Sequence, residues 1–138
     1  MKYPDFMPEL TNSNLIWNRA AMNGGGPVPR QGDISLATLL KFHSLAMSSG
    51  VFSALENLPW GEIQQAAEGF DWFGLDNVAS FLNSALSRME LATTDVDSAN
   101  LELLFDNEYH QLIPQDQTIV SAYEALLRAD PAEFAPMP

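Results

Sequence analysis

Asp106 and His110 are the residues best spaced for chemistry, because they lie four positions apart in a segment with helical periodicity. At that spacing both side chains share one helical face, as metal ligands or an acid–base pair would require. A metal ion needs further ligands, and the only other histidine, His43, lies on an apolar stripe that is typical of a satisfied core residue. The chain has no cysteine, which excludes disulfides, thiolate ligands and thiol nucleophiles. We predict no metal site and no cofactor.

Other catalytic patterns are missing. No serine lies in a Gly-x-Ser-x-Gly turn, and the glycines at 24–26 lack the Lys-Ser/Thr ending of a phosphate-binding loop. The loop with Asp95 and Asp97 lacks the glycine and glutamate of a calcium-binding hand. Paired carboxylates perform acid–base chemistry only where their surroundings separate their pKa values, which a sequence does not display. We predict a non-enzyme. An enzyme stays the alternative if the fold joins further polar groups to Asp106 and His110 in a pocket.

The charge of the chain is strongly negative and unevenly spread. Its 138 residues include 18 acidic and 6 basic side chains, for a net charge of −12. Residues 1–41 hold four basic and three acidic residues, whereas residues 42–138 hold two and fifteen, a net −13. No basic residue lies between Phe42 and Ser87. Such a surface repels nucleic acid and anionic membranes and attracts basic proteins, although acidity for solubility alone is the simpler interpretation.

The acidic residues of the second half define a predicted partner-binding surface. Glu102 and Asp106 are four residues apart, on the side of their helix away from Leu101, Leu104 and Phe105. Carboxylates repeated at such intervals would present a field like that of DNA phosphates. The predicted surface comprises Glu62, Glu68, Asp71, Asp76, Glu102, Asp106, Glu108, Asp116 and Glu124.

Trp72 is a predicted hot spot beside these acids. It falls on the side of its helix opposite Phe70 and Phe73, and exposed tryptophan is common at the centre of protein interfaces. The alternative is that Trp72 packs against Trp60 or a neighbouring loop.

In the segments that must position these side chains, apolar residues recur at helical spacing. No segment alternates apolar and polar residues with the period of two that is typical of a strand. The patterns predict an all-α fold, a compact array of five to six amphipathic helices without a sheet. Asp33 and Asp116 are predicted N-caps, residues 93–98 a loop, and Gly50, Pro59, Gly74 and Pro114 helix ends. The predicted helical segments are 33–47, 51–55, 61–73, 75–89, 101–112 and 117–130, with a further start near residues 15–17.

The predicted organisation is one acidic domain with an appended N-terminal segment. Residues 1–32 are interpreted as an arm with a short helix and a flexible Gly/Pro-rich linker, residues 33–134 as the helical domain and residues 135–138 as a tail. The first residues carry Lys2 and Pro4 where a secretory signal needs an apolar stretch, and no run approaches a membrane span. We expect a cytoplasmic protein.

The second half of the chain, over roughly residues 42–134, resembles the bacterial DNA-mimic-protein family. The first shared motifs are Gly50-Val51-Phe52, Phe73-Gly74-Leu75-Asp76 and Val78-Ala79-x-Phe81-Leu82. The closing motifs are Leu101-Glu102-x-Leu104-Phe105-Asp106-Asn107-Glu108-Tyr109, Ile119-Val120-x-x-Tyr123 and Asp130-Pro131-Ala132-Glu133-Phe134. One departure is Ser48-Ser49-Gly50-Val51-Phe52, where members commonly show a Gly-Gly-Phe turn. The resemblance implies a helical fold and, in the namesake member, an acidic surface that occupies the DNA site of a transcription factor.

These observations lead to a non-enzymatic acidic protein that inhibits a nucleic-acid-binding protein by mimicking DNA. The expected partner is a basic protein, a DNA-binding protein or nuclease, rather than nucleic acid or a membrane, and a homodimer stays open. Charge reversal at Glu102, Asp106 and Glu108 is expected to weaken binding. The alternative is an immunity protein that neutralises a basic toxin such as a nuclease.

Overall fold

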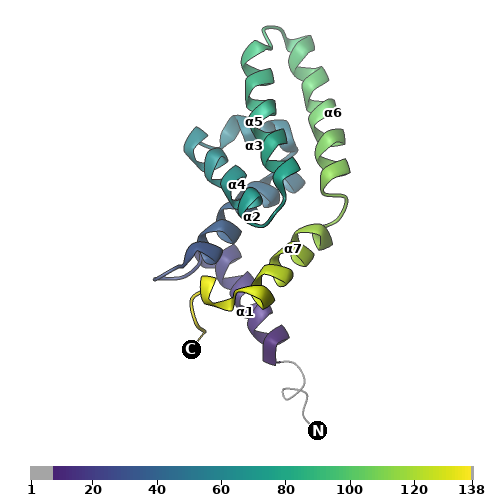
Figure 1. Ribbon diagram of the computed structural model, residues 1–138. Coiled ribbons are helices and arrows are strands. Elements are labelled where there is room, and N and C mark those ends of the chain that lie inside the picture. The colour runs from purple at the N-terminus through teal and green to yellow at the C-terminus, as the bar shows by residue number, and fades with distance from the viewer. Residues whose placement is uncertain (1–7, 138) are drawn as a thin grey trace.

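The structure is a computed structural model that describes residues 8–137 as an array of helices (Figure 1). The all-α prediction is confirmed, and residues 8–137 contain no strand. The predicted count of five to six helices is too low, because residues 8–137 form seven α-helices, of which the N-terminal one is complete in addition to the six predicted segments. The elements are α1 (Pro8–Asn23), α2 (Gln31–Ser49), α3 (Val51–Asn57), α4 (Trp60–Trp72), α5 (Asp76–Leu91), α6 (Asp95–Leu112), α7 (Asp116–Ala129) and a terminal 3₁₀ turn, η1 (Pro131–Glu133).

The starts of the helices differ from the predicted caps. Helix α2 has Arg30 at its N-cap, and Asp33 lies three residues further on, where its carboxylate accepts the Arg30 N–H at 3.0 Å. At this third helical position, an acidic side chain accepts a hydrogen bond from the backbone of the N-cap residue. Asp33 therefore supports the cap from within the helix, and its predicted role as the N-cap is wrong. Helix α7 likewise has Gln115 at its N-cap and Asp116 as its first residue. Each acid therefore lies just inside its helix, where it also favours the positive end of the helix dipole.

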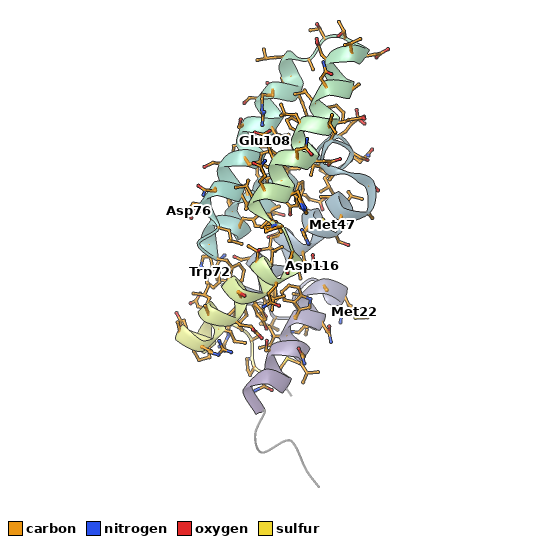
Figure 2. The ribbon with its side chains drawn as sticks, turned by 90° about the vertical axis from the view of Figure 1, so that its right-hand side faces the viewer. Met22, Met47, Trp72, Asp76, Glu108 and Asp116 are labelled. Atoms are coloured by element: carbon orange, nitrogen blue, oxygen red, sulfur yellow. The ribbon has the colours of Figure 1, made fainter. Side chains whose placement is uncertain are left out.

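Helix α6 begins earlier than the apolar pattern predicts. The hydroxyl of Thr94 accepts the Asp97 N–H at 3.0 Å and caps the helix, which then starts at Asp95. The predicted loop over 93–98 is correspondingly shorter. Helices α5 and α6 thus form a long antiparallel hairpin, and its outer end extends beyond the other helices in both views (Figure 1, Figure 2).

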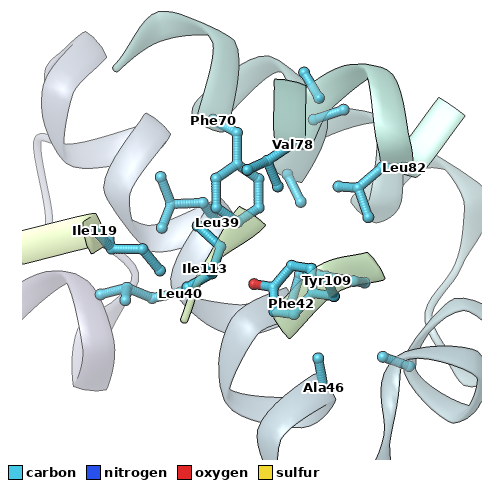
Figure 3. Packing of buried hydrophobic residues seen from close by; sticks show 14 of the residues in the cluster. Leu39, Leu40, Phe42, Ala46, Phe70, Val78, Leu82, Tyr109, Ile113 and Ile119 are labelled. Atoms are coloured by element: carbon cyan, nitrogen blue, oxygen red, sulfur yellow. The ribbon is translucent and has the colours of Figure 1, made fainter. Parts of the chain in front are cut away.

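The core is built around α2, which packs against α1, α3 and α4. Leu36, Leu39 and Phe42 of α2 are fully buried, and Phe70 of α4 packs edge-on against Phe42 with ring centroids 6.5 Å apart. Figure 3 shows these rings between residues of α5, α6 and α7. Helix α2 therefore forms the centre of the core.

Segment 8–32 shares this core, in contrast to the predicted arm and flexible linker. Ile16 and Ala20 of α1 are buried, and the Tyr123 hydroxyl of α7 donates to the Ser13 carbonyl at 2.7 Å. The glycines at 24–26 all have positive φ and turn the chain sharply from α1 into α2. Residues 1–7 of the predicted arm lie outside the described residues.

The C-terminal segment is also fixed to the core. Phe134 is buried, and the Ala135 N–H donates to the Asp33 carboxylate at 2.7 Å. The predicted tail therefore begins with a residue that contacts α2, while Pro138 lies outside the described residues. Among the described helices, none combines the length and apolarity that crossing a bilayer requires.

Candidate protein-binding surface

Four of the five basic side chains in residues 8–137 contact groups of the chain itself, although Arg30 and Lys41 stay exposed. The Arg19 guanidinium is 2.8 Å from the Asp33 carboxylate, Lys41 forms an ion pair with Glu62, and Arg88 lies 3.0 Å from Glu108. Arg30 donates to the Ala132 carbonyl at 3.0 Å. In the part of the chain that the structure describes, Arg128 alone among the basic residues makes no such contact. The surface consequently has few cations to balance its carboxylates.

Two of the nine predicted surface acids belong to these ion pairs. Glu62 is half-buried against Lys41. Glu108 is half-buried against Arg88, whose guanidinium also lies 4.8 Å from the centroid of the Phe105 ring. The Arg88–Glu108 contact lacks hydrogen-bond alignment, so its attraction is ionic. Both acids thus face a cation of a neighbouring helix, in ion pairs that solvent reaches.

Three further predicted acids accept hydrogen bonds from distant parts of the chain. Asp106 accepts the Val51 N–H at 2.9 Å and thereby caps α3. Glu124 accepts the Ser13 hydroxyl at 3.3 Å, and Asp116 lies 2.8 Å from Nε2 of His43. The predicted face of Glu102, Asp106 and Glu108 is therefore not one free surface, because Asp106 faces α3 and Glu108 faces α5.

The remaining four acids, Glu68, Asp71, Asp76 and Glu102, are exposed. Asp71 lies in the last turn of α4 and Asp76 is the first residue of α5, and Gly74 with φ +82° lies in the turn between them. A hydrogen bond that the protonated Asp71 donates to Asp76, together with the negative charge of Asp76, raises the pKa of Asp71. Two carboxyl groups that share a site in this way favour a nearby cation. Figure 2 shows Asp76 and Trp72 on one side of the molecule, away from Met22 and Met47.

Trp72 is packed more firmly than a protruding hot spot would be. Its ring lies edge-on to Phe73 and to Phe134, with centroids 4.9 Å and 6.2 Å apart, and the residue is half-buried. Trp72 thus agrees better with the alternative of packing on a neighbouring segment than with an exposed hot spot. That segment is the one after α7, which contains Phe134, and not Trp60. Trp60 itself is 67% exposed at the start of α4.

Asp106 and His110, the pair best spaced for chemistry, line a shallow hollow of about 410 Å³ between α2, α3 and α6. Its other lining residues are mostly apolar, and the Asp106 carboxylate already accepts the Val51 N–H. In the described part of the chain, no set of three histidine, aspartate or glutamate side chains is close enough to hold a metal ion. The arrangement around the hollow is that of a helix contact.

His43 is the satisfied core residue that its apolar stripe predicted, and it is the centre of a polar relay whose other members the sequence did not indicate. Its Nδ1 lies 2.7 Å from the Tyr109 hydroxyl and its Nε2 lies 2.8 Å from Asp116. With the proton on Nε2, the neutral ring donates to Asp116 and accepts from Tyr109. The relay borders an open groove of about 1000 Å³ that α1 and α2 line. Both ring nitrogens thus have partners within the protein.

The outer part of the α5–α6 hairpin is a second surface that the sequence did not indicate. None of the residues 86–104 is buried, and Leu91, Val96 and Leu103 are 79%, 70% and 68% exposed. The available signal was the spacing of Val96 and Leu103, which are seven residues apart and share a helical face away from Phe105. The acids of this part are Glu90, Asp95, Asp97 and Glu102, all of them exposed.

In comparisons with known proteins, the chain matches no protein-family model, no curated protein and no solved structure.

Proposed function

We propose that this chain is a non-enzymatic acidic protein that inhibits a nucleic-acid-binding protein by occupying its basic groove as a DNA mimic. One observation carries the proposal: within residues 8–137, four of the five cations contact groups of the chain itself, while Glu68, Asp71, Asp76 and Glu102 are exposed and form no ion pair. We call these four residues the acidic patch residues. A chain that used acids only for solubility would intersperse lysines among them, since i,i+4 pairs stabilise helices.

The Asp71–Asp76 pair supports a binding role more than a folding role. The negative charge of Asp76, and the hydrogen bond that a protonated Asp71 donates to it, raise the pKa of Asp71, as expected for two neighbouring carboxyl groups whose ionised forms repel each other. A lysine or arginine of a partner would relieve this repulsion. Both residues are exposed, so they are accessible to such a partner.

The resemblance to the DNA-mimic-protein family supports the finer part of the proposal, namely that the groove is one that binds DNA. Its closing motifs include Glu102 of the acidic patch residues as well as Phe105 and Tyr109, which are buried. Mimicry of this kind relies on charge, and binding should therefore weaken steeply as salt rises.

The test is capture of proteins from a bacterial lysate on the immobilised chain at low salt, followed by elution with duplex DNA. The proposal expects captured DNA-binding proteins that DNA displaces. It also expects loss of capture in the variant Glu68→Gln, Asp71→Asn, Asp76→Asn and Glu102→Gln. This variant should be at least as stable as the wild type because it removes repulsion, so its unfolding midpoint distinguishes lost binding from lost folding. A matched control neutralises two exposed acids elsewhere, Glu56→Gln and Asp130→Asn.

Capture that survives in the patch variant, or that duplex DNA leaves unchanged, would contradict DNA mimicry. If the captured protein is instead a toxic nuclease and cells that express it survive only with this chain, the role is immunity.

A further inference from the structure

The outer end of the α5–α6 hairpin combines exposed apolar side chains with exposed acids, and no layer of the fold covers it. The last buried residue of α5 is Ala85 and the first of α6 is Phe105. Between them only Leu86, Met89 and Leu101 pack partly against the core. Leu91, Val96 and Leu103 of this stretch do not pack against the core.

The apolar residues form a stripe along α6. Val96 and Leu103 lie two turns apart on one face, and Leu91 lies beside the same end in the last turn of α5. Each exposes more than two thirds of its surface to solvent. Burial of an exposed leucine or valine in an interface is favourable by the same hydrophobic effect that forms a core. The stripe is therefore suited to an apolar surface of a partner.

Acids flank this stripe. Asp95 and Glu102 are seven residues apart on the neighbouring face of α6, and Asp97 lies on the other side. Asp95 and Asp97 also stabilise the start of α6 through the helix dipole, whereas Glu90 in the last turn of α5 opposes the dipole of its own helix. Helix stability thus does not explain Glu90.

The charges decide between a second copy of this chain and a different partner. Arg88 is the only basic residue of segment 86–104, and its guanidinium is already committed to Glu108 and Phe105. Two copies that met through this face would bring eight carboxylates together without a cation. A partner with lysine and arginine around an apolar floor would instead complement both the stripe and the acids.

We propose that the outer α5–α6 hairpin, residues 86–104, is the element that enters the partner, with Leu91, Val96 and Leu103 on an apolar floor and the flanking acids on a basic rim. This inference rests on the proposed function and adds to it that recognition is partly hydrophobic. The partner surface is accordingly a basic protein groove with an apolar floor.

Two matched peptides test the inference on the full chain. One is a helical peptide with leucines along one face and lysines along its flanks. The other has the same charge, with glutamines in place of the leucines. Amide shifts of the isotope-labelled protein are expected to map the leucine peptide to residues 86–104, and the glutamine peptide should bind about tenfold more weakly. Val96→Gln with Leu103→Gln should weaken the leucine peptide by a similar factor, while the control Met22→Gln, at an exposed site on α1, should leave it unchanged.

Equal binding of the two peptides, or unchanged binding in the Val96/Leu103 variant, would overturn the inference. If binding then depends only on Asp71 and Asp76, the hairpin assignment fails while the acidic interaction role stands. If neither peptide binds at low salt, both the hairpin assignment and the proposed function fail. A dimer in sedimentation equilibrium that the Val96/Leu103 variant dissociates would show that a second copy covers the stripe, and would also overturn the inference.

Discussion

At the scale of single residues, Asp33 joins three parts of the chain although it is fully buried. Its carboxylate accepts hydrogen bonds from the Arg19 guanidinium, the Arg30 N–H and the Ala135 N–H. A buried carboxylate is tolerable only when its oxygens are satisfied in this way. Asp33 therefore fixes α1, the start of α2 and the C-terminal segment to one another.

Removal of this carboxylate should be among the most damaging single changes. Asp33→Ala leaves Arg19 with little access to water and without its counter-charge, so we expect a loss of about 3–5 kcal/mol in the free energy of unfolding. The control Asp130→Ala, at an exposed acid, should change it by about 0.5 kcal/mol or less. Urea unfolding of both variants measures the difference. Equal losses would show that the Asp33 contacts do not stabilise the fold.

The two buried tyrosines predict how stability changes at high pH. Burial raises the pKa of Tyr123 to about 12 and raises the pKa of Tyr109 further. Below the ordinary tyrosine pKa of 10.0 both states are protonated and stability is complete. Above it the unfolded chain loses protons that the folded chain retains, so the free energy of unfolding should fall as pH rises from about 10 to about 12.

Tyr123→Phe isolates one of these groups. The variant loses the hydrogen bond to the Ser13 carbonyl and should be about 1 kcal/mol less stable near neutral pH. Its stability should then decline less steeply between about pH 10 and 12 than that of the wild type. Denaturant unfolding over this range provides the comparison. Parallel declines in the two proteins would mean that Tyr123 ionises equally well in the folded state.

The acids that the fold uses internally could not be recognised from their positions in the sequence. Asp106 pairs with Val51 across 55 positions, and Asp116 pairs with His43 across 73. Only the packing of helices brings such residues together. The exposed pair Asp71 and Asp76 is closer in sequence, but its meeting depends on the turn at Gly74.

At the scale of elements, helix ends were predictable wherever glycine or proline interrupts an apolar pattern. Gly50, Pro59, Gly74 and Pro114 lie within two residues of the ends of α2, α3, α4 and α6, as predicted. Helix α1 escaped prediction over its first turns because the Asn, Ser and Thr residues at 11–14 have low helix propensity, and packing on α2 and α7 outweighs that preference. Pro8 at its first position was a usable signal.

The contact between α2 and α4 depends on Gly69. A Cβ at this position would lie 2.5 Å from the Ser35 carbonyl oxygen, which belongs to the backbone of α2 and cannot move freely. Gly69→Ala should therefore destabilise the protein by about 1–3 kcal/mol, although alanine is the better helix former. Gly61→Ala in the same helix meets no atom within 4 Å and should stabilise by about 0.4–1 kcal/mol. Thermal unfolding of the pair gives the result, and a gain in stability in Gly69→Ala would refute close packing at this crossing.

At the scale of the whole molecule, the charged side chains fall into two groups, those that pair at contacts between helices and those that stay exposed. The cations and their partner acids lie at helix contacts, including those of α1 with α2 and of α5 with α6. Most of the other exposed acids lie near the α4–α5 turn and on the α5–α6 hairpin, while Glu56 and Asp130 lie elsewhere. Sequence predicted the net charge and its concentration after residue 41, but it could not show which carboxylates stay free.

Displacement of DNA from a captured partner is the most direct measurement of the central claim. A labelled DNA duplex bound to a DNA-binding protein that this chain captures is titrated with the wild type and with the variant that neutralises Glu68, Asp71, Asp76 and Glu102. DNA mimicry predicts complete displacement by the wild type and displacement at least about tenfold weaker by the variant. A stable complex that contains DNA, partner and this chain together would contradict it, and so would equal displacement by both proteins.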